Sequence, residues 1–194
     1  MTTTGRTPAA HLETVEAPGS ILTKSAARAL AVLRITTGFV FLWAFLDKTF
    51  GFGYATPGER AWINGGSPTK GFLSGVEVGP FQGFFHSIAG QTWADWLFML
   101  GMLGVGLALI LGIGMRIAAG AATLIMAMMW LAEFPIARST SGGEATHSTN
   151  PVVDYHLIYG VTTIALALTY AGQTWGLGKF WARLPIVQKH RWLV

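Results

Sequence analysis

The sequence WADWLFMLGMLGVGLALILGIGMRIAAGAATLIMAMMWLAEFPIA, residues 93–137, decides the fold of this chain. It contains two long apolar blocks, residues 93–115 and 117–137, separated only by a short turn around Gly112 and Arg116. At about 1.5 Å per helical residue, each block is long enough to cross a hydrocarbon layer of roughly 30 Å. The stretch therefore predicts a hairpin of two transmembrane helices.

Two more apolar blocks flank this hairpin, and the whole composition is that of a membrane protein. Of the 194 residues, 52% are hydrophobic and 11% are charged, against roughly a quarter charged in a soluble domain. In the last block Asn150 is expected to cap the helix, with Pro151 at its first position. We expect an all-α fold, an integral membrane four-helix bundle within residues 21–172. The predicted spans are residues 29–50, 93–115, 117–137 and 152–171.

The segments outside the spans have distinct characters. Residues 1–20 are rich in Thr, Pro and Ala without apolar periodicity, which predicts a disordered tail. Residues 173–194 form a basic tail. Residues 51–91 are expected to form short interfacial helices in an exoplasmic loop, with a capping box and an N1 proline over residues 56–59. A re-entrant loop is the alternative, although its glycines would expose backbone groups to lipid.

The distribution of charge predicts the orientation in the membrane. One side of the predicted bundle is basic, and the other side carries both signs. Because Lys and Arg are enriched in cytoplasmic loops, both termini are expected in the cytoplasm. The basic side holds Lys24, Arg28, Arg34, Arg116, Lys179, Arg183, Lys189 and Arg191. The mixed side holds Lys48, Arg60, Lys70, Arg138, Asp47, Glu59, Glu77, Asp95, Glu133, Glu144 and Asp154.

Several classes of function are disfavoured by the residues present. The chain has no cysteine, which excludes disulfides, thiolate metal sites and iron–sulfur clusters. His156 is the only histidine inside a predicted span, so a bis-histidine haem is not expected. No glycine-rich phosphate or dinucleotide motif is present, and no flavin motif. The basic residues are scattered, so the lipid bilayer and not a nucleic acid is the expected partner.

The remaining ionisable residues predict one polar layer at the outer membrane boundary. Such groups are rare in spans and are natural candidates for function. Aromatic and methionine side chains recur at helical spacing beneath the layer, for example Phe39 and Trp43, or Met126 and Trp130. If these stripes face one another, they form an apolar slot with polar groups at its mouth. The layer comprises Asp47, Lys48, Asp95, Glu133, Asp154 and His156.

Such a slot suits a quinone headgroup, which needs flat apolar walls, hydrogen bonds to two carbonyl oxygens and a proton carrier. Menaquinone is the cofactor that we expect. The candidate catalytic residues are Glu133, Asp154 and His156. The candidate cofactor-binding residues are Trp43, Asp47, Lys48, Trp130 and Tyr159.

A plainer interpretation explains the same residues without a ligand. Charged side chains often lie at helix ends because water is near, and Asp154 suits the dipole of a helix start. A mixed carboxylate–histidine metal site at Glu133, Asp154 and His156 is an alternative, which is disfavoured because residues two apart should point to different helix faces. Arg34 is expected either to reach the cytoplasmic headgroups or to pair with an acid.

The chain resembles a known family in two places. Leu33-Arg34, Gly38, Phe41-Leu42 and Asp47-Lys48 look like the opening signature of DoxX/DoxD-like membrane proteins. WINGGSPTKGF, residues 62–72, is similar to the long first loop of actinobacterial members. The resemblance covers about residues 28–172 and implies a small four-helix subunit associated with membrane redox chemistry, whose named example is a subunit of a thiosulfate:quinone oxidoreductase.

These observations lead to three functional hypotheses. The first is a quinone-interacting or quinone-adjacent subunit of a membrane oxidoreductase, whose electrons come from elsewhere because this chain offers no redox group. The second is a non-catalytic accessory or anchor subunit of a respiratory complex. The third is a small-solute or anion transporter, for which a single four-helix bundle would need to oligomerise. A partner subunit or a homo-oligomer is expected in each case.

Overall fold

The computed structural model describes residues 23–194, so the tail predicted for residues 1–20 lies outside the described residues. The described part of the chain is helical and contains no strand. Three of its helices are long and apolar enough to cross a membrane: α2 (Lys24–Phe50), α5 (Thr92–Leu111) and α6 (Met115–Glu133). The prediction of an all-helical chain with membrane-crossing helices is confirmed for these three.

The last long helix, α7 (Tyr155–Leu168), is shorter than predicted, because a different residue caps it. Asp154 is the N-cap, and its side chain accepts a hydrogen bond from the Leu157 amide at 3.1 Å. The carboxamide oxygen of Asn150 instead accepts from the amides of Val152 and Val153. The predicted helix over residues 152–171 with an Asn150 cap is therefore wrong in its bounds.

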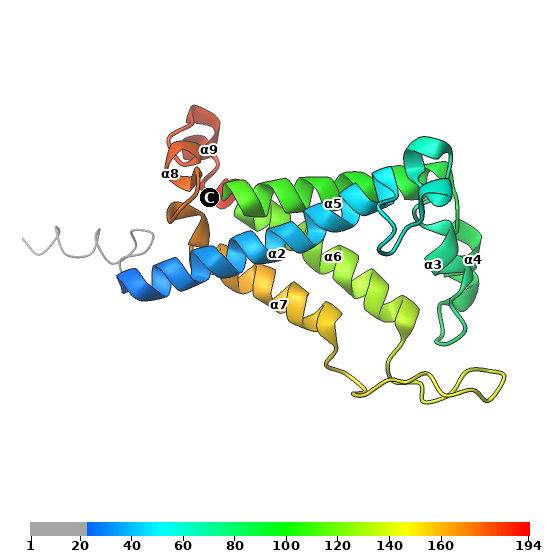
Figure 1. The fold of residues 1–194 in the computed structure, drawn as a ribbon. Coiled ribbons are helices and arrows are strands. Elements are labelled where there is room, and N and C mark those ends of the chain that lie inside the picture. Colours follow the sequence, from blue (N-terminus) through cyan, green and yellow to red (C-terminus); the bar gives the residue numbers. More distant parts are fainter. Residues whose placement is uncertain (1–22) are drawn as a thin grey trace, which may run out of the picture.

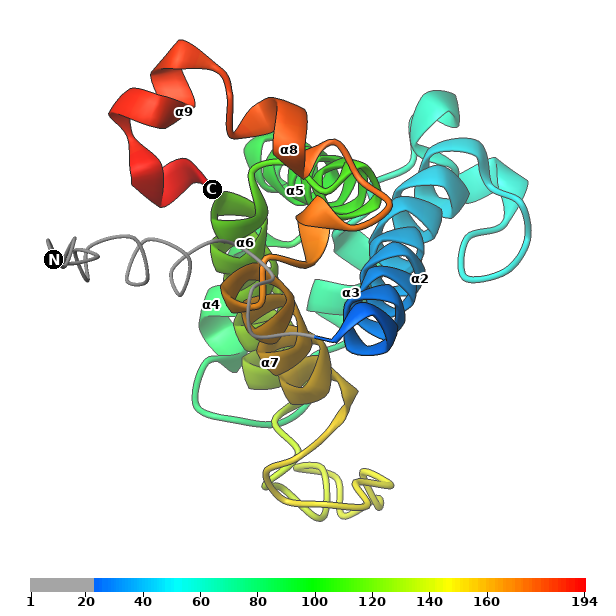
Figure 2. The same ribbon diagram turned by 90° about the vertical axis from the view of Figure 1, so that its left-hand side faces the viewer.

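These four helices pack side by side around one apolar core. α2 packs against α5, α5 against α6 and α6 against α7, and α7 also contacts α2 (Figures 1 and 2). Each of the four contributes buried apolar side chains, so burial of this surface holds the helices together. The core consists of Phe41, Met102, Val105, Leu109, Met115, Ala119, Ala122, Met126, Leu166, Ala167 and Ala171.

The predicted hairpin turn between α5 and α6 is confirmed, and it depends on glycine. Gly112 ends α5 with a φ of 72°, in the left-handed region where a side chain is strained. A Cβ on Gly112 would lie 2.8 Å from the Cα of Gly172, so two backbones meet at this point. The turn is therefore also a packing contact with the segment that follows α7.

Arg34 occupies the same end of the molecule and is fully buried. Its guanidinium donates to the carbonyls of Leu109 and Ile110 at the end of α5, and to those of Thr174 and Trp175 after α7. The last carbonyls of a helix carry partial negative charge, which favours a cation there. The expectation that Arg34 snorkels or pairs with an acid is therefore wrong, since backbone carbonyls are its partners.

Residues 51–91 form four short helices with a small core of their own. α3 and α4 pack against the end of α6 through Leu73, Val76, Phe85 and Ala132. The predicted capping box is wrong, because the first helix starts at Gly58 and has no side-chain cap. The helices are η1 (Gly58–Arg60), η2 (Trp62–Asn64), α3 (Lys70–Ser74) and α4 (Gln82–Ile88).

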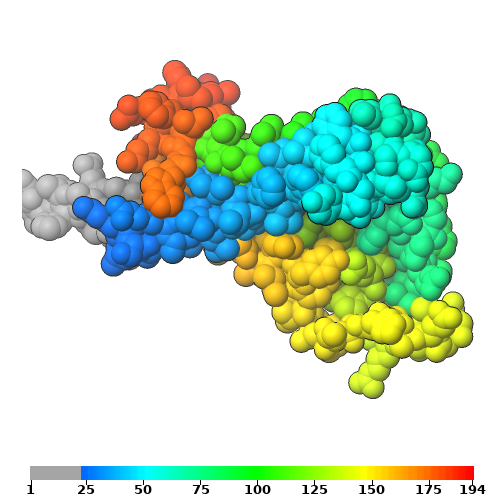
Figure 3. Space-filling model, viewed as in Figure 1, coloured from blue at the N-terminus to red at the C-terminus, as the bar shows by residue number. Residues whose placement is uncertain are grey.

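The remaining segments lie at opposite ends of the long helices. The residues after α7 fold over the end formed by the α5–α6 turn and the start of α2 (Figure 1). At the other end, residues 134–154 project as an irregular segment below α7 (Figure 3). The helices after α7 are η3 (Ala171–Gln173), α8 (Gly178–Trp181), α9 (Pro185–Lys189) and η4 (Arg191–Leu193).

Candidate functional site

Four polar side chains meet where α6 ends and α7 begins. Glu133 is the last residue of α6, while Asp154, Tyr155 and His156 start α7. The Tyr155 hydroxyl donates to Glu133 Oε1 at 2.8 Å. His156 Nδ1 lies 2.8 Å from Asp154 Oδ2 and 3.9 Å from Glu133 Oε2. We call Glu133, Asp154, Tyr155 and His156 the junction cluster.

The junction cluster forms because Asp154 is outside the helix. Its backbone is extended, with φ −116° and ψ −173°, so its side chain turns back toward the first turn of α7. One carboxylate oxygen accepts a hydrogen bond from the Leu157 amide, and the other is hydrogen-bonded to His156 Nδ1. The expectation that Asp154 and His156 point to different faces is therefore wrong, since it assumed that both were helical.

His156 is fully buried and uses only one side of its ring. An ionised carboxylate only accepts hydrogen bonds, so beside Asp154 the Nδ1 atom carries a proton and donates it. Nε2 is buried without a partner among the described residues. A buried polar atom without a partner costs about 1–3 kcal/mol. The imidazole is therefore held in place by the apolar core and by Asp154, at some cost in stability.

The junction cluster forms one wall of a polar pocket of about 570 Å³. The other walls come from residues 72–78 and from the projecting segment, residues 135–150. Glu77, Glu144 and His147 also line it, and none of the described lining residues is Lys or Arg. With the carboxylates of Glu133 and Asp154, this lining produces a negative potential that attracts protons and cations. We call this space the acidic pocket.

An apolar groove of about 370 Å³ adjoins the acidic pocket. It runs between the short helices α3 and α4 and the long helices α5 and α6. Phe72 lines both spaces, so the two meet at α3. The groove is lined by apolar side chains, among them Leu73, Phe85, Phe98, Ile125 and Met128. Its walls suit a hydrocarbon chain.

Asp47 and Asp95, two members of the predicted polar layer, bond to the first loop and do not join the junction cluster. Asp47 is buried and accepts hydrogen bonds from the amides at positions 54–56, at 2.9 to 3.4 Å. Asp95 is also buried and accepts from the hydroxyls of Ser67 and Thr69 and from the Thr69 amide. Both carboxylates hold residues of the first loop in place. The layer at the outer membrane boundary stays a prediction.

The predicted aromatic stripe of α2 also points away from the junction cluster. Phe39 is half exposed, and Trp43 packs against it and against Phe52 and Tyr54 of the first loop. Phe41, two positions from both Phe39 and Trp43 and so on the other side of the helix, is the buried aromatic of α2 and contacts Tyr159 edge to face. The buried face of α2 is therefore displaced from the predicted one.

The other predicted cofactor-binding residues are divided between two places. Tyr159 lies one turn below the junction cluster, where its ring meets that of Tyr155 edge to face. Trp130 donates from its indole nitrogen to the Val152 carbonyl at 3.0 Å, which ties α6 to the segment before α7. Lys48 is partly buried near the end of α2 and has no ion-pair partner within the described chain. Trp130 and Tyr159 thus adjoin the site.

Sequence reasoning missed Tyr155 and the residues of the projecting segment. Tyr159 was favoured as the phenol because it shares a helix face with His156, whereas Tyr155 bonds to Glu133 across the helix junction. Glu77, Glu144 and His147 lie in irregular segments, where periodicity carries no information about direction. The one available signal was the density of polar residues between Ser139 and Asn150.

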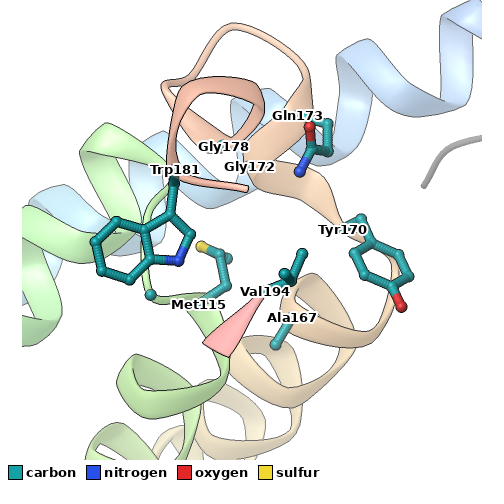
Figure 4. Close-up of a pocket in the computed structure, with 10 residues that line it drawn as sticks. Met115, Ala167, Tyr170, Gly172, Gln173, Gly178, Trp181 and Val194 are labelled. Atoms are coloured by element: carbon teal, nitrogen blue, oxygen red, sulfur yellow. The ribbon is translucent and has the colours of Figure 1, made fainter. Parts of the chain in front are cut away.

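A second cavity lies at the opposite end of the molecule, near Arg34. It is lined by Met115, Tyr170, Trp181 and Val194 together with close-packed glycines (Figure 4). Its volume is about 10 Å³, which is at the lower limit for a single water molecule. This cavity therefore has no room for a small-molecule ligand, and the acidic pocket is the better candidate.

Comparison with known proteins does not assign the chain to a family. No family model, no curated protein and no solved structure matches the chain.

Proposed function

We propose that this chain is a DoxX-like subunit of the bacterial plasma membrane that binds a quinone, with menaquinone as the expected cofactor, and takes part in a membrane oxidoreductase. The observation that carries the proposal is the junction of two unlike spaces at Phe72. The acidic pocket can receive a polar headgroup and the apolar groove can receive an isoprenoid tail. An amphiphile with a flat polar head and a long apolar tail suits this pair.

The proposal includes a four-span bundle with both termini in the cytoplasm. α7 has 14 residues, which give about 21 Å at 1.5 Å per residue. This is shorter than the roughly 30 Å of a hydrocarbon core, so the fourth crossing would include residues that flank the helix. The helices α3 and α4 would then lie at the outer interface beside the pocket.

The proposed orientation is supported by where the charges lie. The α5–α6 turn with Arg116, the start of α2 and the basic segment after α7 share one end of the molecule (Figure 1). The acids of the junction cluster lie at the other end, with the projecting segment. The positive-inside rule then assigns the first end to the cytoplasm and the acidic pocket to the outside.

In this proposal the junction cluster exchanges protons with the headgroup. Reduction of a quinone takes up two electrons and two protons, and oxidation of the quinol releases them. The Tyr155 hydroxyl and the Glu133 and Asp154 carboxylates line the pocket and would touch the headgroup. His156 lies behind them and would exchange a proton through Asp154. The electrons come from a partner subunit, because the chain has no cysteine to hold a cluster or a dithiol.

The test is menaquinone binding to the purified full chain in lipid nanodiscs. Tyr155→Phe removes a hydroxyl from the head region and Glu133→Gln replaces its carboxylate by a neutral carboxamide. Each should weaken binding by about tenfold, the equivalent of about 1.4 kcal/mol. Met128→Trp narrows the apolar groove and should weaken binding of long-tailed menaquinone more than binding of a short-tailed analogue. Leu107→Trp, on an exposed position of α5 outside the groove, is the matched control.

Two outcomes would contradict the proposal. The first is unchanged menaquinone affinity in Glu133→Gln, Tyr155→Phe and Met128→Trp, with all three proteins folded. The second is a loss of binding in Leu107→Trp as large as in Met128→Trp, which would assign the effect to the lipid-facing surface. If the variants only alter co-purification of other subunits, the chain is an accessory or anchor subunit instead.

A further inference from the structure

We propose that the junction cluster binds a divalent transition-metal ion such as Zn²⁺ through Glu133, Asp154 and His156. One ligand atom from each residue lies within 4.8 Å of the other two. The bonds of Zn²⁺ to nitrogen and oxygen are about 2.0–2.2 Å, so its ligand atoms stand roughly 3.4 Å apart in a tetrahedron. The 3.9 Å between His156 Nδ1 and Glu133 Oε2 is close to that value.

The ring of His156 is the observation that separates this cluster from an ordinary group of acids. It is fully buried, it belongs to the core side of α7, and it directs Nδ1 at the carboxylates of both Asp154 and Glu133. One nitrogen of the same ring has no partner in the described chain. A buried imidazole that faces two carboxylates is a nitrogen ligand fixed in direction before any ion arrives.

Binding requires only a shift of one proton within the ring. The ion takes the lone pair of Nδ1, and the single ring proton of the neutral imidazole moves to Nε2. Nε2 lacks a partner in either form, so ligation creates no additional unpaired polar atom. The two carboxylate charges neutralise the ion. The Asp154–His156 distance of 2.8 Å then widens as the ion replaces the hydrogen bond.

The surroundings of the cluster suit a metal ion and leave part of its coordination open. Tyr155 donates to Glu133 Oε1, which orients that carboxylate and leaves Oε2 toward His156. Hydrogen bonds of this kind hold metal ligands in position. Glu133 and Asp154 line the acidic pocket, so the remaining positions of the ion would face a space of about 570 Å³. An ion with three protein ligands and an open position toward a pocket is the arrangement of an exchangeable or reactive site.

One consequence concerns the proposed quinone site, and it rests on that proposed function. The ion and the Nδ1 proton compete for the same nitrogen, so a bound ion would stop proton exchange between His156 and Asp154. Zn²⁺ would then inhibit quinone turnover without displacing the quinone tail from the apolar groove. The binding of the ion does not depend on the quinone proposal.

The experiment measures Zn²⁺ binding to the full chain in nanodiscs, without quinone, by calorimetry and elemental analysis. Co²⁺ serves as a second probe, because its visible absorption reports nitrogen and oxygen coordination. One ion per chain is expected. Glu133→Gln, whose side chain is partly exposed, should fold and should weaken Zn²⁺ at least tenfold, since loss of even an outer partner of a metal ligand costs about 10–100-fold. His156→Gln should abolish the Co²⁺ absorption.

His190→Ala is the matched control, because His190 is exposed and lies outside both the acidic pocket and the cluster. Its Zn²⁺ affinity should equal that of the unaltered chain. Zn²⁺ affinity that is unchanged in Glu133→Gln, or that falls as much in His190→Ala, would overturn the proposal. So would the absence of any stoichiometric Zn²⁺ binding. Absence of menaquinone binding to the unaltered chain, with Zn²⁺ binding as expected, would contradict only the quinone function.

Discussion

A buried ionisable side chain lies at each end of the long helices, and the surroundings of the two side chains differ. At one end Arg34 is surrounded by four backbone carbonyls and by glycines, beside a cavity of about 10 Å³. At the other end Glu133 and Asp154, the acids beside His156, open into about 570 Å³. One buried nitrogen has no partner within the described chain in each case, Nε of Arg34 and Nε2 of His156. The first end uses its charge to hold helices together. The second presents carboxylates to a space that can receive a ligand.

The two loop-holding acids support the same distinction within one end. Asp47 accepts hydrogen bonds from loop amides, Asp95 accepts three through Oδ1 from Ser67 and Thr69, and both acids are almost fully buried. Glu133 is partly exposed and has a single hydrogen bond from Tyr155. Carboxylates at similar positions on the helices therefore have different roles. The acids that hold the loop accept several hydrogen bonds from the chain, and Glu133 accepts one.

Replacing Arg34 should have the largest effect on stability. Arg34→Met removes a charged donor from four carbonyls, of which only that of Leu109 keeps another donor in the described chain, the Gly112 amide. We expect a loss of about 3–5 kcal/mol in the free energy of unfolding. Denaturation in mixed micelles, followed by circular dichroism, measures it. Arg28→Met, at an exposed position on the same helix, is the control and should change stability by no more than about 0.5 kcal/mol. Equal stability of the two variants would show that the two ends do not differ as described.

Replacing Gly112 tests the close backbone contact beside Arg34. Gly112→Ala places a Cβ 2.8 Å from the Gly172 Cα at a φ of 72°, so we expect a loss of about 1–3 kcal/mol in the same denaturation measurement. Gly104→Ala, on α5 with no atom within 4 Å of the added Cβ, is the matched control and should cost nothing. A fully stable Gly112→Ala would show that the turn can separate from the segment after α7.

The smallest expected difference compares two acids at the pocket end. Asp47→Asn removes a charged acceptor from the loop amides and should cost about 1–2 kcal/mol, with faster hydrogen exchange at residues 54–56. Glu133→Gln should stay within about 0.5 kcal/mol of the unaltered chain, because its side chain is partly exposed. A larger loss of stability from Glu133→Gln than from Asp47→Asn would reverse the roles that we assign to them.

The helical segments were largely predictable because their signals are local. Apolar blocks of span length and the glycines of the α5–α6 turn are visible in the sequence, and α2, α5 and α6 match them within a few residues. The start of α7 was not predictable, because Asn150 and Asp154 are both good caps. Asn150 instead bonds to the next two amides, and the choice depends on where α7 packs.

The sequence predicted which residues belong to the candidate site better than it predicted how they are arranged. Glu133, Asp154 and His156 stood out because ionisable residues are rare in apolar helices. The rotation of α2 about its axis decides which of its side chains face the core. It directs Asp47 to a loop and Phe41, instead of Trp43, to Tyr159. A helix whose apolar residues surround it on all sides gives little indication of this rotation.

The sequence by itself determined that the chain is helical and apolar, because the length of each hydrophobic block follows directly from residue identity. It also determined that the chain has no cysteine. Only the tertiary structure decided which charges are occupied and which are available. Hydrogen-bond partners of Arg34, Asp47 and Asp95 come from segments distant in the chain or from irregular loops, and no local pattern encodes them. The junction cluster likewise exists because two helix ends, separated by residues 134–153, meet in space.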